Sequence, residues 1–180
     1  MGARLWSGDE ELSSPLHNPG TGTPMGCARI EKRSHGSKRP ELRAVPQRAA
    51  PSDVLLIRPT SHAHQAWLPL QPNAKVGTSS VRRRDQLLLL RPDLDIQALR
   101  GNVPTRIERL REGLYDAIVL ASAGVQRLEL DLSDLIQVEL EPRWFVPAPA
   151  QGALALQMRS NDPNVAWLRQ LSHAQTAAAI

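Results

Sequence analysis

The sequence contains few aromatic residues and a single cysteine. Aromatic residues make up 3% of its 180 residues, and Cys27 is the only cysteine. The core must therefore be aliphatic, and an apolar share of 41% is sufficient to build one. A single cysteine excludes an internal disulfide and a zinc site made of several cysteines. The length allows one domain and a tail.

Long apolar runs are also missing. No run approaches the length that spans a membrane, and the N-terminus lacks the continuous apolar stretch of a secretory signal. Residues 1–50 contain arginine and serine, as transit peptides do, but also five acidic residues, which transit peptides avoid. We therefore expect a cytoplasmic protein without a membrane partner.

Positive charge is concentrated outside the part of the chain that is expected to fold. The net charge is +4, but residues 1–50 hold 8 Lys and Arg against 5 Asp and Glu, which leaves +1 for the other 130 residues. Nucleic-acid-binding domains combine a basic face with aromatic stacking platforms. The near-neutral folded region and the scarcity of aromatics therefore count against nucleic acid as a partner.

The chain changes character near residue 51. Residues 1–50 show no helical or strand periodicity and are interrupted by five prolines. Such a segment cannot bury enough apolar surface to offset its ordering entropy, so we expect residues 1–51 to be a disordered tail. Strands are then expected at 53–57, 75–78, 94–99, 115–121, 135–140 and 152–158, and helices at 81–91, 104–111, 123–128 and 162–171. Their alternation predicts an α/β domain with a mostly parallel sheet.

Two strand-to-helix turns carry the residues that favour anion binding. In the first, Gly77-Thr78-Ser79-Ser80 precedes a helix that opens with Arg82, Arg83 and Arg84. A helix start offers unpaired backbone N–H groups and a partial positive charge, so arginines are unfavourable there unless an anion offsets them. Serine and threonine hydroxyls at this place can cap the helix or bind a ligand.

The second turn, Arg100-Gly101-Asn102-Val103-Pro104-Thr105-Arg106, also follows a strand and opens a helix. Two such turns in neighbouring units would place four arginines around one crevice, at the strand ends where α/β sheets bind ligands. Guanidinium groups hold carboxylates by paired hydrogen bonds. The residues alone therefore predict a site for a small polycarboxylate or a phosphate. No Walker-type Gly-Lys-Ser/Thr is present, which disfavours nucleotides.

Other candidate sites are weaker. His62 and His64 lie in a proline-rich loop with no third ligand in view, so no metal site is expected. Asp93 and Asp95 flank the start of a strand and are expected to be solvated. No nucleophile and base have a suitable spacing, so we assign no catalytic residue.

Four segments resemble successive motifs of the porphobilinogen deaminase (hydroxymethylbilane synthase) family. They are VGTSSVRR (76–83), LRGNVPTR (99–106), YDAIVLASAGVQRL (115–128) and VPAPAQGALALQMR (146–159). DVLLI (53–57) and PNAKVGTSS (72–80) resemble its approach to the second domain, and the resemblance covers about residues 52–180. It implies an incomplete periplasmic-binding-protein-like fold, with the second domain at 52–145. Residues 146–180 would be a return segment toward a missing first domain, followed by a C-terminal helix.

The resemblance also implies an activity and a set of site residues. The family condenses four porphobilinogen molecules to hydroxymethylbilane in tetrapyrrole and haem synthesis, on a dipyrromethane cofactor attached to a cysteine. It therefore implies porphobilinogen and linear pyrrole chains as partners, dipyrromethane as cofactor, and a monomeric protein. By motif position, the residues that bind substrate or cofactor carboxylates are Thr78, Ser79, Ser80, Arg82, Arg83, Arg100, Asn102, Arg106, Arg127, Gln151 and Gly152.

Two parts of the family's chemistry have no counterpart in the motifs. Residues 1–50 show nothing like the HSLKD-type stretch that supplies the family's catalytic Lys and Asp, and Cys27 lies on the wrong side of the matched region to hold the cofactor. Only 148–158 resembles a first-domain strand, and we expect it to lack sheet partners. Three alternatives remain: a truncated deaminase inactive by itself, a non-catalytic module that binds anionic pyrrole carboxylates, and a nucleic-acid-binding protein.

Overall fold

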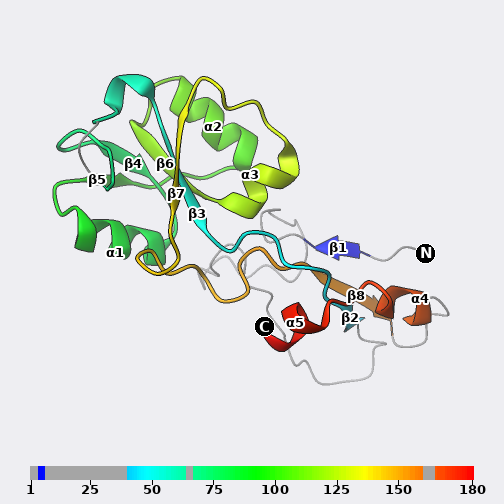
Figure 1. Cartoon of the computed structure of the whole chain (residues 1–180). Coiled ribbons are helices and arrows are strands. Elements are labelled where there is room, and N and C mark those ends of the chain that lie inside the picture. Colours follow the sequence, from blue (N-terminus) through cyan, green and yellow to red (C-terminus); the bar gives the residue numbers. More distant parts are fainter. Residues whose placement is uncertain (1–3, 7–39, 64–66, 160–164) are drawn as a thin grey trace.

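The computed structural model describes residues 4–6, 40–63, 67–159 and 165–180, which form two β-sheets (Figure 1). The larger sheet has the strand order β5-β4-β6-β3-β7. Its strands are β3 (Asp53–Ile57), β4 (Lys75–Gly77), β5 (Asp95–Gln97), β6 (Ala117–Ala121) and β7 (Ile136–Leu140). β3 is antiparallel to both neighbours, so the other four strands run in one direction. The predicted α/β domain is confirmed, and its sheet is mixed, because β3 forms two antiparallel pairings beside the two parallel ones.

Helices cover both faces of the larger sheet. Successive strand residues point to opposite faces, so Leu55 of β3 packs with Leu87 of α1 (Val81–Leu90), whereas Leu56 packs with Ile107 of α2 (Val103–Arg111). α3 (Ser122–Leu128) lies on the same side as α2 (Figure 1). Phe145 is the one aromatic side chain in the buried clusters of the described residues, as the composition predicts.

The strand-to-helix turns form as their residues predict. Ser80 caps α1, since its hydroxyl accepts a hydrogen bond from the Arg83 amide, and Asn102 caps α2 in the same way for Thr105. Gly113 follows α2 with a φ of +81°, the left-handed conformation that favours glycine after a helix. Within the described residues, no helix has the length and apolar character needed to cross a bilayer.

The smaller sheet corrects two expectations. It pairs β8 (Ala155–Arg159) antiparallel with β1 (Arg4–Trp6) on one side and β2 (Pro40–Ala44) on the other. The expected absence of regular structure in residues 1–51 is therefore wrong for these two strands, and so is the expectation that 148–158 lacks sheet partners. Pairing partners more than 100 residues away leave no local periodicity that would reveal them. Residues 7–39, also assigned to the tail, lie outside the described residues.

One face of the smaller sheet carries a minor core, and two short helices complete this region. Ala44, Leu156 and Met158 form its buried cluster with Leu168 of α4 (Val165–Arg169). α5 (Ala174–Ala178) follows, and its predecessor His173 donates its backbone N–H to the Val45 carbonyl. The helix expected at 162–171 is thus confirmed in part, since residues 160–164 lie outside the described ranges.

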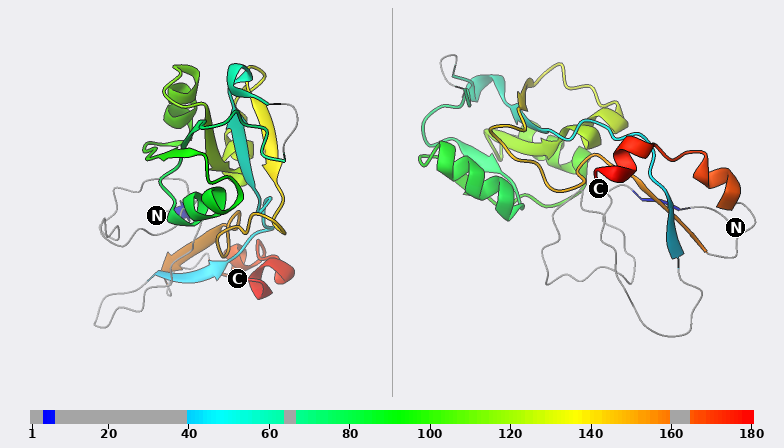
Figure 2. Two further views of the ribbon diagram at one scale, coloured as in Figure 1. Left: turned by 90° about the vertical axis from the view of Figure 1, so that its left-hand side faces the viewer. Right: turned by 60° about the horizontal axis from the view of Figure 1, so that its bottom comes forward.

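Two connecting segments lie side by side between the sheets, and we call them the junction: residues 48–53 and 148–152 (Figure 2). The Arg48 guanidinium donates to the Gln151 carbonyl at 2.8 Å, and the Ala49 amide donates to the Gly152 carbonyl at 3.1 Å. Gly152 has a φ of +83°, and a Cβ there would lie 2.7 Å from the Ala49 oxygen. The junction is therefore tightly packed as well as hydrogen bonded.

Candidate functional site

The turn between β4 and α1 presents its hydroxyls at a helix start. Ser79 donates its hydroxyl to the Leu99 carbonyl at 2.6 Å, which ties this turn to the one that precedes α2. Thr78 is nearly buried, and its hydroxyl accepts the Ser80 amide at 3.2 Å. These bonds fix the turn in a shape that leaves the start of α1 with its partial positive charge.

A cavity of about 330 Å³ lies over this turn. Thr78, Ser79 and Ser80 of the first predicted turn line it, and so does Arg100 of the second turn. Arg84 of α1 lines it as well. The two turns thus meet as predicted, but two arginines rather than the expected four line the cavity. Arg100 is exposed, and its guanidinium has no hydrogen bond or ion pair with any described residue. It is therefore available to an anion.

Arg84 was part of the triple-arginine pattern and also faces this cavity. Its guanidinium pairs with the neighbouring Asp85 at 2.9 Å, and both side chains are at least half exposed. An exposed pair of this kind is weak. Arg84 can therefore exchange Asp85 for a ligand at little cost.

Arg82 and Arg83 point away from that cavity and share Asp53, the first residue of β3. Asp53 is completely buried, and its two carboxylate oxygens lie 2.8 Å from Arg82 and 2.7 Å from Arg83. Arg83 is 1% exposed and also donates to the Val119 carbonyl, so it reaches no solvent-borne ligand in this arrangement. Arg82 is 21% exposed and retains some access.

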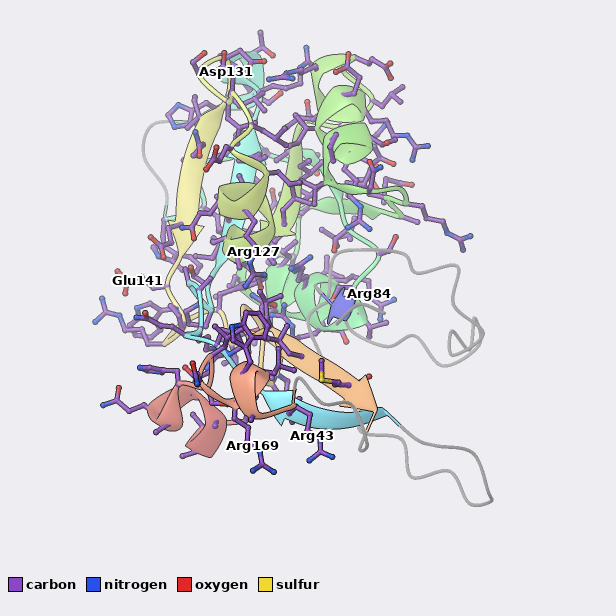
Figure 3. The ribbon with its side chains drawn as sticks, turned by 90° about the vertical axis from the view of Figure 1, so that its right-hand side faces the viewer. Arg43, Arg84, Arg127, Asp131, Glu141 and Arg169 are labelled. Carbon is purple, nitrogen blue, oxygen red and sulfur yellow. The ribbon has the colours of Figure 1, made fainter. Side chains whose placement is uncertain are left out.

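The other predicted binding residues form hydrogen bonds with backbone groups and do not line the cavity. Arg106 donates to the Gly101 carbonyl, and the Asn102 side chain caps α2. Arg127 donates to the Gly152 carbonyl at 2.7 Å, and Figure 3 shows it between the two sheets. Their assignment as ligand residues stays a prediction, since their visible role is to shape the turn and the junction.

Gln151 is the most enclosed of the predicted residues. It is fully buried, and its side-chain amide nitrogen lies 2.7 Å from the Pro51 carbonyl and 2.9 Å from Asp53. Its side-chain oxygen faces Arg82 at 3.3 Å. The sequence pointed to Gln151 but missed Asp53, which looked like an ordinary strand start. The available signal was an acidic residue at the edge of a wholly apolar strand.

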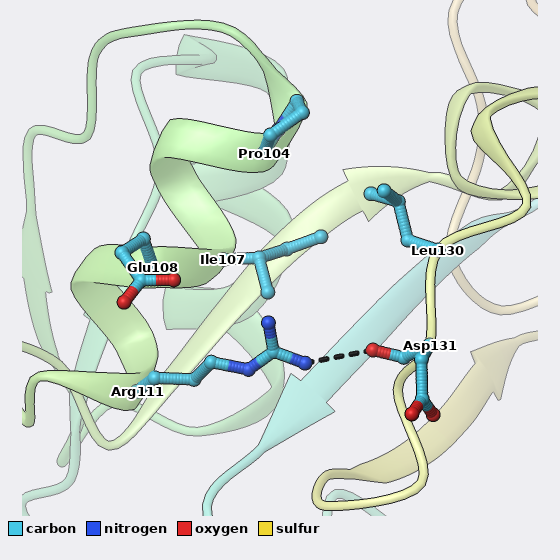
Figure 4. Close-up of a pocket in the computed structure, with 6 residues that line it drawn as sticks. All are labelled: Pro104, Ile107, Glu108, Arg111, Leu130 and Asp131. Carbon is cyan, nitrogen blue, oxygen red and sulfur yellow. Dashed lines mark hydrogen bonds between the residues drawn. The ribbon is translucent and has the colours of Figure 1, made fainter.

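A second cavity, of about 290 Å³, lies between α2 and the loop after α3 (Figure 4). Arg111 lines it and is committed to its own neighbours, because it donates to the Asp131 carbonyl and to both carboxylate oxygens of Asp134. This hydrogen bonding lowers the pKa of the Asp134 carboxyl. No predicted site residue lines this cavity.

No group of three or more His, Cys, Asp or Glu side chains suited to a metal ion occurs in the described part of the chain. His62 forms an isolated β-bridge with Leu70, whereas His64 falls outside the described residues. The residues around the first cavity thus offer cations and hydrogen-bond donors, a set suited to carboxylates or phosphates.

A family model and several curated proteins match most of this chain. A family model described as porphobilinogen deaminase, dipyromethane cofactor binding domain, matches residues 34–167. Porphobilinogen deaminases from Roseiflexus sp. (strain RS-1) and Thermus thermophilus are 47% identical over 140 residues and 50% over 122, which covers 77% and 68% of this chain. The chain spans only 43% and 38% of those relatives.

Solved structures give a weaker likeness. A Salmonella typhimurium periplasmic binding protein, described as highly specific for arginine, aligns with a TM-score of 0.43 and 11% identity over 76% of this chain and 58% of its own. An ancestral cationic amino acid solute binding protein aligns with a TM-score of 0.41 and 12% identity, over 74% of this chain and 55% of its own. Neither likeness bears on the ligand.

Proposed function

This chain belongs to the porphobilinogen deaminase family, and from that premise we propose that it binds the carboxylates of porphobilinogen and linear pyrrole chains at the start of α1. In the complete family architecture this binding serves the synthesis of hydroxymethylbilane for tetrapyrroles. The family match begins at residue 34, earlier than the motifs near residue 52 indicated. The second strand of the smaller sheet therefore belongs to the family region as well.

The observation that carries the proposal is the Arg100 guanidinium. It is exposed, has no partner among the described residues, and lines one cavity with Thr78, Ser79 and Ser80. A cation opposite the start of a helix is the arrangement that favours an anion. The forked guanidinium matches a carboxylate better than a point charge does. Pyrrole acetate and propionate groups fit this chemistry.

The same donors fit the dipyrromethane cofactor of the family. Its carboxylates would be held by Arg100, Arg84 and the hydroxyls of Thr78 to Ser80, all of which line the cavity. The cofactor, when bound, would supply the pyrrole to which the first porphobilinogen is joined. The residues of this chain bind and orient the carboxylates.

We further propose that the chain by itself does not turn porphobilinogen over. The residues that line the cavity include no Asp, Glu or His, and general acid–base catalysis requires such a group within reach of the reacting atoms. A non-catalytic module that binds pyrrole carboxylates would have the same lining. An assay for hydroxymethylbilane with the purified Cys27→Ser chain tests this, and turnover would contradict it.

Calorimetry with porphobilinogen tests the binding proposal. Arg100→Ala should weaken binding about tenfold or more, because a charge-assisted hydrogen bond contributes about 1.5–3 kcal/mol. Arg169→Ala is the matched control, since it removes the same charge from α4, a helix beside the smaller sheet (Figure 3). Wild-type affinity should fall as salt is added. Equal binding by wild type and Arg100→Ala would place the site elsewhere.

A further inference from the structure

Contacts from three parts of the chain hold the Arg82 guanidinium. One terminal nitrogen, Nη1, donates to the Val146 carbonyl at 2.5 Å. The other, Nη2, lies 2.8 Å from Asp53 and 3.3 Å from the side-chain oxygen of Gln151. The Nε atom is buried and has no hydrogen-bond partner. A guanidinium has five N–H donors, so one Nη1 hydrogen is left for a ligand.

Gln151 connects this guanidinium to the junction. Its amide nitrogen contacts the carbonyls of Pro51 and Ser52 and one carboxylate oxygen of Asp53. Only this orientation of the amide places its oxygen toward Arg82 and its nitrogen toward three acceptors. Because Gln151 is completely buried, it touches no ligand that enters from solvent.

We infer that Gln151, together with Asp53, is a positioning residue that acts through Arg82 on a ligand carboxylate outside the cavity that Arg100 lines. Asp53 pairs with both Arg82 and Arg83, so the three side chains keep one net positive charge. Gln151 holds the Arg82 guanidinium in place, which fixes the direction of its remaining Nη1 hydrogen. This inference rests on the proposed carboxylate binding, and it replaces direct ligand contact with an indirect role for Gln151. Arg100 lines the cavity over the turn before α1, which Arg82, Asp53 and Gln151 do not line, so its contacts do not depend on Gln151.

The alternative is that Gln151 only holds the two connecting segments together. The two roles differ in one respect. A positioning residue loses its effect on binding when Arg82 is absent, whereas a structural residue weakens binding in every background. A double-mutant cycle measures this difference, since coupling appears only between groups that act together.

The experiment is an NMR titration of the full chain with porphobilinogen, which measures weak affinities, combined with the arginine Nε–Hε signals. Gln151→Met is made in the wild type, in Arg82→Ala and in Arg100→Ala. Gln151→Asn replaces it if Gln151→Met does not fold, because it retains an amide but cannot span the distance to Arg82. Urea unfolding of each variant records stability separately.

We expect Gln151→Met to weaken binding about fivefold in the wild type and in Arg100→Ala, the equivalent of one hydrogen bond, and to have no further effect in Arg82→Ala. Equal weakening in all three backgrounds would overturn the inference. If the wild type or Arg82→Ala shows no measurable binding, the Arg82 Nε–Hε signal decides. A shift of that signal in Gln151→Met, with the Arg100 signal unchanged, supports positioning, and an unchanged Arg82 signal refutes it. Absence of wild-type binding alone would refute only the proposed function.

Discussion

The two sheets differ in how much apolar surface holds them together. Among the residues that the structure describes, the five-stranded sheet lies between buried clusters of 12 and 11 residues, whereas the three-stranded sheet has one cluster of four. The larger sheet also draws its strands from one continuous stretch, residues 53–140, whereas the smaller combines strands from both ends of the described chain. The turns that we propose to bind anions belong to the larger sheet and its helices, so we expect the smaller sheet to open first and any ligand binding to persist after it opens.

Substitution of Asp53, which pairs with Arg82 and Arg83, should have the largest effect on stability. Asp53→Ala leaves Arg83, which is 1% exposed, as an uncompensated buried cation. Removing one partner of a buried ion pair costs about 3–5 kcal/mol, and we expect a loss of that size in urea unfolding. Combining Asp53→Leu with Arg83→Met should recover much of it. A loss below about 1 kcal/mol for Asp53→Ala would show that water reaches Arg83.

Matched core truncations test the difference between the sheets directly. Leu55→Ala, in the centre of β3, should lower the global free energy of unfolding by about 2–5 kcal/mol. Leu156→Ala in β8 should act mainly on local opening, because its cluster has four members. Amide hydrogen exchange would then show lost protection in β8 and retained protection in β6. Equal loss of protection in both strands would show one cooperative unit.

Gly152 in the junction and Gly113 after α2 have similar backbone conformations but different surroundings. A Cβ at Gly152 would meet the backbone oxygens of Ala49 and Ala50 at 2.7 and 2.8 Å, whereas at Gly113 it would meet the end of the flexible Arg58 side chain at 3.1 Å. Both have positive φ, which costs about 1–3 kcal/mol for other residues. Gly152→Ala should therefore reach the upper end of that range in thermal unfolding and Gly113→Ala the lower end. The reverse order would mean that the junction yields easily.

Substitution of Asp116 is expected to change the stability least. Burial raises the pKa of its carboxyl, but hydrogen bonds from the Ser61 hydroxyl and the Lys75 amide, with the charges of Arg58 and Lys75, lower it overall. A folded-state pKa below the usual value of about 3.9 contributes stability above that pH, which is lost as the pH falls through the folded value. Asp116→Asn should cost about 1 kcal/mol at neutral pH and make acid unfolding less steep below about pH 4. Parallel pH curves for both proteins would contradict this.

The larger sheet was predictable because its signals are local. Apolar runs, the Asn102 cap and Gly113 mark its strands and helices within a few residues. The strand expected at 53–57 is found with those bounds, and the bounds of the other four strands are shifted by at most two residues. β2 was not predictable, since Pro40–Ala44 contains a proline and two charged residues and forms a strand only through its pairing with β8.

The site was predictable in composition but only partly in arrangement. The meeting of Thr78, Ser79 and Ser80 with Arg100 followed from two similar turns in neighbouring units. The sequence could not show that Arg82 and Arg83 would face Asp53, because that pairing depends on β3 being packed beside β6, inside the sheet. Neighbouring arginines thus become exposed or buried according to whether they pack against β3.

The pairing of β2 with β8 has a consequence for how the chain is made. Leu42 finds its strand partner, Gln157, roughly 115 residues later. At a synthesis rate of about 5–20 residues per second, β2 leaves the ribosome on the order of ten seconds before its neighbour exists. The larger sheet has time to form during that interval, because its strands emerge in between. The edge of β2 meanwhile remains open to other chains, so the smaller sheet is the part of this molecule whose assembly a chaperone would most affect.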